Sequence, residues 1–181
     1  FSSQYLYVPP RLDEIPVGSI TTVAGVGVFK GESGPATSAS VDPTNIVFDS
    51  AGNVYIAEPD YDVVSRVRTD GVIERFAGAA TGSLSNARPC CGDGGPAVDA
   101  AISFPRGVAI DASDNIYIGD KGNCRVRRVD AVTGIISTVA GTGVCGFSGD
   151  GGPATEARIS RPIYITSTGT DLFFNDFDNL R

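Results

Sequence analysis

The segments Pro105-Arg-Gly-Val-Ala-Ile-Asp111, Asn115-Ile-Tyr-Ile-Gly-Asp120 and Ile135-Ile-Ser-Thr-Val-Ala-Gly141 form a pattern that this chain of 181 residues repeats. An earlier copy reads Pro43-Thr-Asn-Ile-Val-Phe-Asp49, Asn53-Val-Tyr-Ile-Ala-Glu58 and Val72-Ile-Glu-Arg-Phe-Ala-Gly78, and a further copy opens at Arg161-Pro162. Repetition at such a period is typical of repeat architectures. A residue that recurs in register in each copy is therefore more often framework than catalytic machinery.

The spacing divides each repeat into a constant part and a variable part. From the opening proline to the closing glycine there are 35 residues in one copy and 36 in the next. From each closing glycine to the proline of the next Gly-Pro-Ala there are 10, 18 and 12 residues. A constant length indicates a folded unit and a variable length a surface loop. The extra residues of the longest loop fall within residues 79–91.

Short strands fill the constant part. Residues 107–111, 115–119, 125–130 and 135–141 are runs rich in β-branched residues, and turn-type compositions separate them at 112–115 and 131–134. Four antiparallel strands in about 36 residues are the blade of a β-propeller. Residues 154–159 predict one helical turn in a connecting loop.

The combination Val-Ala-Gly, Gly-Asp-Gly-Gly-Pro-Ala, Pro-x-Gly-Val-Ala-x-Asp and Asn123-Cys-Arg-Val-Arg127 resembles the NHL-repeat family, in its long-loop, extracellular type. The resemblance covers residues from about 18 to 181. It implies an all-β fold of four-stranded antiparallel blades, commonly six in a ring. Members bind protein, RNA or ligands, and a few are enzymes.

On this basis residues 1–181 are expected to be a partial propeller of about three blade equivalents. The expected parts are the end of a preceding blade at 1–25, blades at 43–78 and 105–141, the start of another at 162–181, and inter-blade loops at 79–104 and 142–161. So few blades cannot close a ring, since propellers need four to eight. We therefore expect further protein to cover the open ends, either more blades of the same chain, as part of a larger ring, or an adjacent subunit.

Composition excludes several functions. The net charge is −7, which disfavours nucleic acid as a partner. The basic cluster Arg125, Arg127 and Arg128 is interpreted as a solvated strand face. No apolar run reaches the length of a membrane span. Histidine is absent, which removes the commonest general base and imidazole-bound zinc.

The four cysteines favour an oxidising compartment, and hence an extracellular or cell-surface location, because they lack the C-x-x-C spacing of a zinc site. Cys124 begins the third strand of a blade and Cys145 follows the fourth, so the turn at 131–134 brings them to one end, where they can form a disulfide. Cys90 and Cys91 either pair elsewhere or with each other, and their partners stay unknown.

Other motifs are assigned structural roles. Gly141-Thr-Gly-Val-Cys-Gly146 matches a dinucleotide motif, but no helix can follow it, so the match is fortuitous. Glycine and proline around Glu32, Asp93 and Asp150 predict a structural turn; calcium would need more ligands, which Asp171, Asp176 and Asp178 could offer. One blade position repeats as an aromatic residue, and we expect these rings to pack between blades: Tyr55, Tyr117 and Phe173. Four carboxylates are expected to be turn or strand-end residues: Asp49, Asp111, Asp120 and Asp176.

We therefore expect a non-catalytic, extracellular binding or structural module that acts through protein–protein contacts and has no catalytic, cofactor or metal residues of its own. The alternative is a propeller enzyme, a metal-dependent lactonase-like or lyase-like protein, whose site lies in blades outside this sequence.

Overall fold

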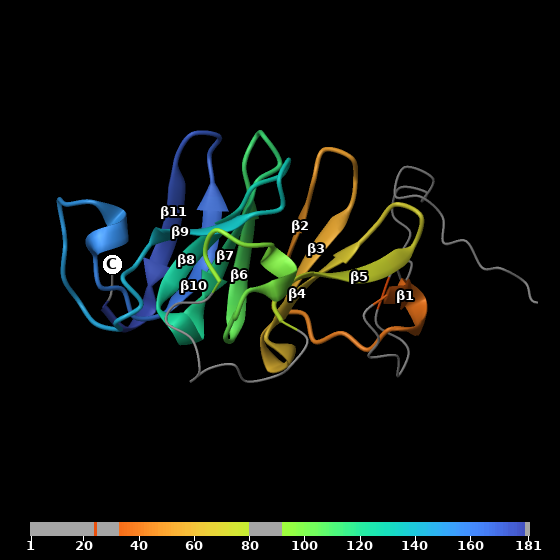
Figure 1. Cartoon of the computed structure of the whole chain (residues 1–181), viewed down its shortest axis with the longest axis horizontal. Coiled ribbons are helices and arrows are strands. Elements are labelled where there is room, and N and C mark those ends of the chain that lie inside the picture. Colours follow the sequence, from red (N-terminus) through yellow and green to blue (C-terminus); the bar gives the residue numbers. More distant parts are fainter. Residues whose placement is uncertain (1–23, 25–32, 80–91, 180–181) are drawn as a thin grey trace, which may run out of the picture.

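The computed structural model describes residue 24 and residues 33–79 and 92–179. These residues form three antiparallel sheets that lie side by side along the long axis of the molecule (Figure 1). The all-β, propeller-type fold predicted from the sequence is therefore confirmed. Apart from residue 24, the expected part at 1–25 lies outside the described residues, as do the middle of the 79–104 loop and Glu32, Cys90 and Cys91.

The first sheet has the strand order β1-β5-β4-β3-β2. Its strands are β1 (Ser33–Pro35), β2 (Asn45–Phe48), β3 (Val54–Glu58), β4 (Val63–Val67) and β5 (Val72–Ala77). Strands β2 to β5 form the four-stranded meander expected of a blade. The sequence did not predict β1, which comes from the preceding loop and pairs with the outer strand β5.

The second sheet repeats the meander, and the third contains its first half. The second has the order β6-β7-β8-β9, from β6 (Pro105–Ile110), β7 (Ile116–Asp120), β8 (Arg125–Val129) and β9 (Ile136–Ala140). The third pairs β10 (Pro162–Ser167) with β11 (Leu172–Asp176). Short 3-10 helices connect the elements: η2 (Ala36–Ser38), η3 (Pro59–Tyr61), η4 (Ala97–Asp99), η5 (Lys121–Asn123), η6 (Ala154–Glu156) and η7 (Phe177–Asn179). The turn expected within 154–159 is η6.

Alternating side chains pack one sheet against the next. Between the first two sheets the core contains Val64 and Ala77 from one side and Ile118 and Val129 from the other. A second core joins Val126 and Ala140 of the second sheet to Ile159, with residues of β10 and β11 packed against it. Strand alternation sends neighbouring residues to opposite faces, so the second sheet supplies side chains to both cores.

The loop between the first and second sheets contacts the outer strands of both blades. Gly78 donates its N–H to the Ala97 carbonyl in η4, at the end of the first sheet. The same loop then exchanges hydrogen bonds with β9: Gly94 donates to the Ile136 carbonyl (2.8 Å), and Ile136 donates to that of Gly95 (3.0 Å). The contact recurs, since Gly141 donates to Ala154 in η6. The loop has the sequence pattern of a spacer, but its described residues 92–100 hold the two blades together, and we call this segment the clasp.

Apolar side chains are exposed on the outer faces of the first and third sheets. Ile46 and Phe48 of β2 are about half exposed, on the face opposite Val47, which packs toward the second sheet. At the other end, Tyr164 of β10 is 71% exposed and Phe173 of β11 is 56% exposed. These two faces have the composition of packing surfaces.

Candidate functional site

A groove of about 740 Å³ lies between the first and second sheets, at the end where their strand-connecting turns meet. The first sheet lines it with Asp49, Tyr55, Arg66, Arg75 and Phe76, and the second with residues 113–114 and 129–134. Residues 96–98 of the clasp complete the lining. Clefts between structural units are common binding sites.

The wall from the first sheet combines aromatic rings with paired charges. Tyr55 and Phe76 pack edge to face, with ring centroids 4.7 Å apart. The guanidinium of Arg66 lies over the Phe76 ring, 5.7 Å from its centroid, and its Nε donates to Glu74 at 2.8 Å. A cation held over a ring by a carboxylate has a fixed position. This wall therefore presents an ordered positive group.

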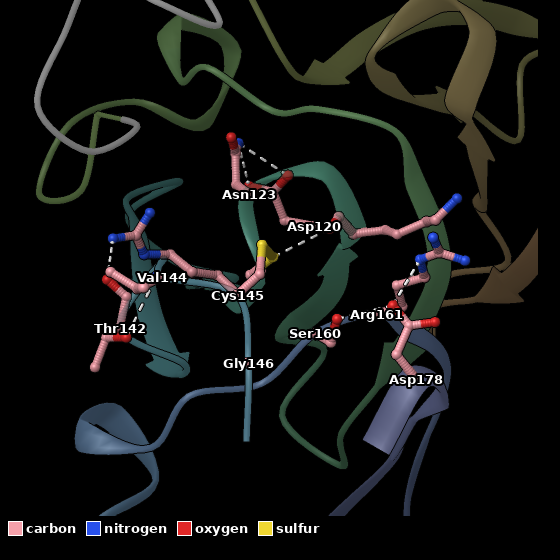
Figure 2. Close-up of a disulfide and its surroundings, with 12 residues drawn as sticks. Asp120, Asn123, Thr142, Val144, Cys145, Gly146, Ser160, Arg161 and Asp178 are labelled. Atoms are coloured by element: carbon pink, nitrogen blue, oxygen red, sulfur yellow. Dashed lines mark hydrogen bonds and ion pairs between the residues drawn. A yellow bond between two sulfur atoms is a disulfide. The ribbon is translucent and has the colours of Figure 1, made fainter. Parts of the chain in front are cut away.

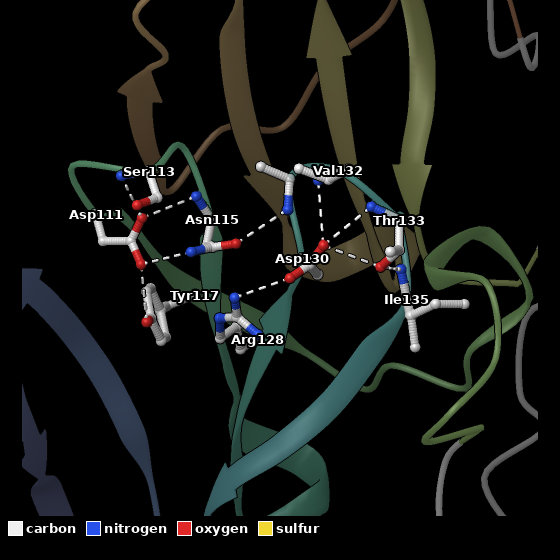
Figure 3. Close-up of polar contacts among 10 residues, drawn as sticks. Asp111, Ser113, Asn115, Tyr117, Arg128, Asp130, Val132, Thr133 and Ile135 are labelled. Atoms are coloured by element: carbon white, nitrogen blue, oxygen red, sulfur yellow. Dashed lines mark hydrogen bonds and ion pairs between the residues drawn. The ribbon is translucent and has the colours of Figure 1, made fainter.

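The wall from the second sheet consists of two turns joined by an amide (Figure 3). Asp130 accepts hydrogen bonds from the N–H groups of Val132 and Thr133. It also forms an ion pair with Arg128, whose Nη2 atom lies 2.9 Å from Oδ2 of Asp130. Asn115 accepts the Ala131 N–H through Oδ1 and donates through Nδ2 to Asp111. Because Asn115 is buried between the turns, it fixes the groove's edge.

Asp49 and Asp111 form the same turn in the two sheets. Each accepts the N–H two and four residues later, the amide of an asparagine, and a tyrosine hydroxyl at 3.1 Å. The roles expected of Asp49 and Asp111 as turn residues agree with this geometry. Tyr55 is buried in the core between the sheets, Tyr117 is partly buried, and Phe173 is exposed.

Direct hydrogen bonds between the sheets hold the walls together. The Ser50 N–H and hydroxyl both donate to the Asp114 carboxylate across the rim of the groove. Away from the groove, at the start of β2, the Thr44 hydroxyl donates to the Arg106 carbonyl (3.1 Å), and the Val108 N–H donates to Asn45 Oδ1 (2.7 Å). The groove is therefore a rigid feature of the paired blades.

Hydrogen bonds lower the pKa of two carboxylates in the groove, Asp49 and Asp130. Partial burial alone would raise the pKa of Asp49, but donation from Asn53 and Tyr55 lowers it below its ordinary value. The N–H and hydroxyl of Thr133 lower the pKa of Asp130 in the same way. A general acid or base needs a pKa near the working pH. These two carboxylates suit charge recognition rather than proton transfer.

The interpretation of Arg125, Arg127 and Arg128 as a solvated strand face is wrong. Arg125 is buried and the Arg127 side chain is 0% exposed; only Arg128 reaches solvent. Arg127 pairs with Asp120, which is equally buried, at 3.3 Å and with Asp93 in the clasp at 2.5 Å. Burial raises the pKa of Asp120 to about 6, although Asn123, the Ser103 N–H and Arg127 oppose the shift. A buried charge requires such partners.

The sequence did contain a signal for this pair. In the run Arg125–Asp130, polar and apolar residues do not alternate regularly, as they would in a strand with one solvated face. The preceding strand ends in a carboxylate, Asp120. In the first sheet the same two positions are Glu58 and Ser65, which hydrogen-bond to each other. Burial raises the pKa of Glu58 as well. The second sheet has Asp120 with Arg127 at these two positions and the first sheet has Glu58 with Ser65, so in both sheets the two side chains form one buried hydrogen-bonded pair.

Cys124 and Cys145 are joined by a disulfide in the structure, with their Cα atoms 5.3 Å apart (Figure 2). Cys124 adopts φ = 51° at the end of η5. Arg125 donates to the carbonyl of Thr142, so that the loop after β9 is held at a second point. The disulfide thus fastens that loop to the start of β8.

Asp93 and Asp150 occupy equivalent turns, and Asp93 additionally pairs with Arg127, a contact that the sequence did not predict. Asp120 and Asp176 both lie at strand ends, and Asp178 pairs with Arg161. Across the described ranges 33–79 and 92–179, no three acidic or cysteine side chains are grouped to hold a metal ion. No helix in that part of the chain is long and apolar enough to cross a membrane.

Comparison with known proteins identifies similar sequences in one group. The model of the Teneurin NHL domain matches residues 82–145. Teneurin-3 of Mus musculus is 30% identical over 179 residues, covering 91% of this chain and 6% of the relative. Teneurin-1 of Gallus gallus is 35% identical over 91 residues, covering 46% and 3%. The chain therefore spans a small fraction of the length of these relatives.

Solved structures support the fold alone. A structural genomics protein of unknown function from Bacteroides thetaiotaomicron superposes with a TM-score of 0.62 at 24% identity, covering 88% of this chain and 37% of that one. An auxiliary nutrient binding protein from the same organism has a TM-score of 0.55 at 22% identity, covering 74% and 35%. Both matches extend well beyond a single sheet.

Proposed function

From the premise that this chain belongs to the NHL-repeat family, we propose that it is a non-catalytic module that binds protein outside the cell through the groove between its first two sheets. The observation that carries the proposal is the combination of a rigid, accessible groove with charged groups already fixed by hydrogen bonds. Pre-ordered groups bind a partner with little loss of conformational entropy.

The chemistry of the groove favours a protein ligand. Arg66 and Phe76 lie on one wall and Asp130 on the other, so the site offers an aromatic surface between opposite charges. Val132 stands at the rim with 94% of its surface exposed, where an apolar contact is available. Aromatic and arginine side chains with a polar rim are the usual composition of protein–protein interfaces.

The extracellular part of the proposal rests on the cysteines. A disulfide between Cys124 and Cys145 persists in oxidising compartments and is rare in the cytosol. The similarity to the Teneurin NHL domain is consistent with the same type of repeat. The exposed apolar faces around Phe48 and Tyr164 are proposed to pack on further protein, as blades do in a larger propeller ring.

The lactonase-like or lyase-like alternative is not favoured. A hydrolytic site would need a group whose pKa permits proton transfer, or a cluster of metal ligands. In the groove, hydrogen bonding lowers the pKa of Asp49 and Asp130. Their local turns account for both carboxylates.

The test uses the chain displayed as a bivalent fusion and an array of secreted and cell-surface ectodomains. We expect binding that Val132→Asp weakens at least about tenfold, since it places a charge in the desolvated contact. Val144→Asp is the matched control, because Val144 is also exposed but does not line the groove. Equal loss in both variants, or binding unaffected by Val132→Asp, would refute the groove as the site. Lactone hydrolysis dependent on an added divalent metal would support the enzyme instead.

A further inference from the structure

A cluster of three cations lies at the strand ends opposite to the groove. Strand β6 begins beside this cluster and leads, at its other end, into the turn of residues 111–115 that borders the groove. The three cations come from different segments: Arg106 of β6, Lys121 of η5 and Arg161, just before β10. The cluster shares no residue with the groove, so what it binds is independent of the proposed function.

The ring of Phe104 holds two of these cations together. The Cζ atom of Arg106 lies 5.9 Å from the centroid of the ring, and the Nζ atom of Lys121 lies 5.0 Å from it. Phe104 has φ = 52°, a left-handed conformation that is rare for a large side chain. Its N–H donates to Oδ1 of Asp62, between η3 and β4, at 2.7 Å. The first sheet thus stabilises an unfavourable backbone conformation at a residue whose ring contacts two cations.

Backbone contacts fix the other two segments of the cluster. The Gly122 N–H donates to the Ser103 carbonyl at 2.8 Å, and a Cβ atom on Gly122 would collide with the Ser103 hydroxyl, so η5 packs directly on the segment before β6. Strand β10 packs against β6 and β7, which brings Arg161 to the cluster. Its Nε atom pairs with Asp178 at 2.9 Å (Figure 2). The three cations are therefore held by the fold itself.

The cluster lacks the carboxylates that three cations require. Among the described residues, neither the Arg106 nor the Lys121 side chain forms a hydrogen bond or an ion pair, and the Nε atom of Arg106 is buried without an acceptor. Burial and the charges of Arg106 and Arg161 lower the pKa of Lys121, although Asp178 opposes the shift. Buried or crowded charges are costly unless a partner compensates them. An anion bound here would supply that partner.

The residues of the cluster are not part of the repeated framework. The surrounding strands recur in each sheet, but these three positions carry unlike side chains. In the first, second and third sheets the positions are Asp42, Phe104 and Arg161; Thr44, Arg106 and Ile163; and Pro59, Lys121 and Phe177. Packing of a blade does not require them, since the other sheets form without them. The cluster is therefore a local feature of the junction between the second and third sheets.

The geometry points to a binding site for a doubly charged tetrahedral oxyanion, of the phosphate or sulfate type, between Arg106, Lys121 and Arg161. The planar fork of an arginine and the compact ammonium of a lysine are the two kinds of donor that such groups accept. An oxyanion would give Arg106 the acceptor that it lacks. The net charge of −7 disfavours a polyanion such as nucleic acid, so a single dianionic group fits better.

The pKa of Lys121 provides a direct readout. The sequence has two lysines, Lys30 and Lys121, so lysine labelled with carbon-13 at Cε gives two NMR signals, and Lys121→Gln identifies one of them. Each pKa is measured at constant ionic strength in sodium chloride and in sodium sulfate, whose anion does not titrate in this range. We expect sulfate to raise the pKa of Lys121, because a bound dianion stabilises the ammonium form. An unchanged pKa of Lys121, or an equal rise at both lysines, would overturn the proposal.

Calorimetric titration with sulfate, at constant ionic strength, tests the ligands one by one. Arg106→Gln and Lys121→Gln should each raise the Kd at least about tenfold, because each removes a charged donor. Arg68→Gln is the matched control: it removes the same charge from an exposed side chain that pairs with Asp70, and it should change the Kd by less than about twofold. Lys121→Gln lies in a short surface turn and keeps the test decisive if Arg106→Gln folds poorly. Equal weakening by Arg68→Gln would show a general effect of charge and refute the site.

Three further probes define the ligand: inorganic phosphate, phenyl phosphate and acetate. Tighter binding of phenyl phosphate than of inorganic phosphate would assign the site to a phosphate group carried on a larger molecule, and the reverse order would assign it to the free ion. Acetate, a planar ion with one charge, should bind at least about tenfold more weakly than sulfate. Equal affinity for acetate and sulfate would overturn the assignment to a dianion.

Discussion

Removal of the buried guanidinium provides the sharpest test of how the blades are held together. In Arg127→Leu, the isobutyl group fills part of the space but carries no charge. Asp120 then remains with its carboxylate 0% exposed and without its cation, and Asp93 loses its partner in the clasp. Breaking a buried ion pair from one side costs about 3–5 kcal/mol.

The control lies one residue away on the same strand. Arg128 also forms an ion pair, with Asp130, but both side chains are about one-third exposed. Such surface pairs contribute about 0–1 kcal/mol. Arg128→Ala should therefore be nearly silent, although it removes the same charge from the same strand as Arg127→Leu.

Urea unfolding followed by far-ultraviolet circular dichroism measures the difference. With a slope of about 2 kcal/mol per molar urea, Arg127→Leu should lower the midpoint by about 2 M. The double variant Arg127→Leu/Asp120→Asn should recover much of the loss, because removing both charges of a buried pair is far less costly than removing one. A midpoint for Arg127→Leu within about 0.5 M of Arg128→Ala would refute the reasoning, as would a double variant no more stable than the single one.

Three further outcomes are expected. Because the pKa of Asp120 is raised, the native state binds a proton at this carboxylate more tightly than the unfolded chain does. This group therefore makes the free energy of unfolding rise as the pH falls from about 7 to 4, by at most about 3 kcal/mol. Asp120→Asn should remove that rise from thermal melts measured over the same pH range. Gly107→Ala would drive its Cβ into the Ile163 carbonyl of β10 and should cost about 1–3 kcal/mol in urea unfolding, whereas Gly152→Ala, whose Cβ comes no closer than 3.4 Å to a neighbour, should change stability by less than about 0.5 kcal/mol. Mass spectrometry of a non-reducing digest should link Cys124 to Cys145, a bond worth about 3 kcal/mol in the chain-entropy estimate, and free thiols at both positions would remove the argument for an oxidising compartment.

The repeat predicted the sheets because strand length, turn composition and period all agree. The framework at Asp111, Asn115 and Tyr117 is local in sequence, so its turn could be expected from composition. What the sequence concealed is long range. Arg127 has the sequence pattern of a surface charge, and only the fold shows that Asp93 and Asp120 converge on it; Asp93 is 34 residues away, in the loop between the blades.

The groove was equally hidden. Tyr55 and Asp130 belong to different blades, and only the packing of one sheet on the next brings their turns together. The apolar sequence pattern specifies that sheets stack, but it does not specify which turn residues meet at the rim. A pairing such as Ser50 with Asp114, 64 residues apart, depends on the stacking angle between the sheets.

The clasp between blades has a mechanical consequence. Residues 94–100 form hydrogen bonds to β9 of the second sheet and also to Gly78 and Ala79 after the first sheet, so this loop overlaps both blades. Under tension, an outer strand cannot peel away until the loop that covers it has been lifted. Under force the blades should therefore unfold one at a time from an end, with a separate force peak for each clasp. The middle loop can lengthen at 79–91 without weakening this order, because the added residues lie between the two points of attachment.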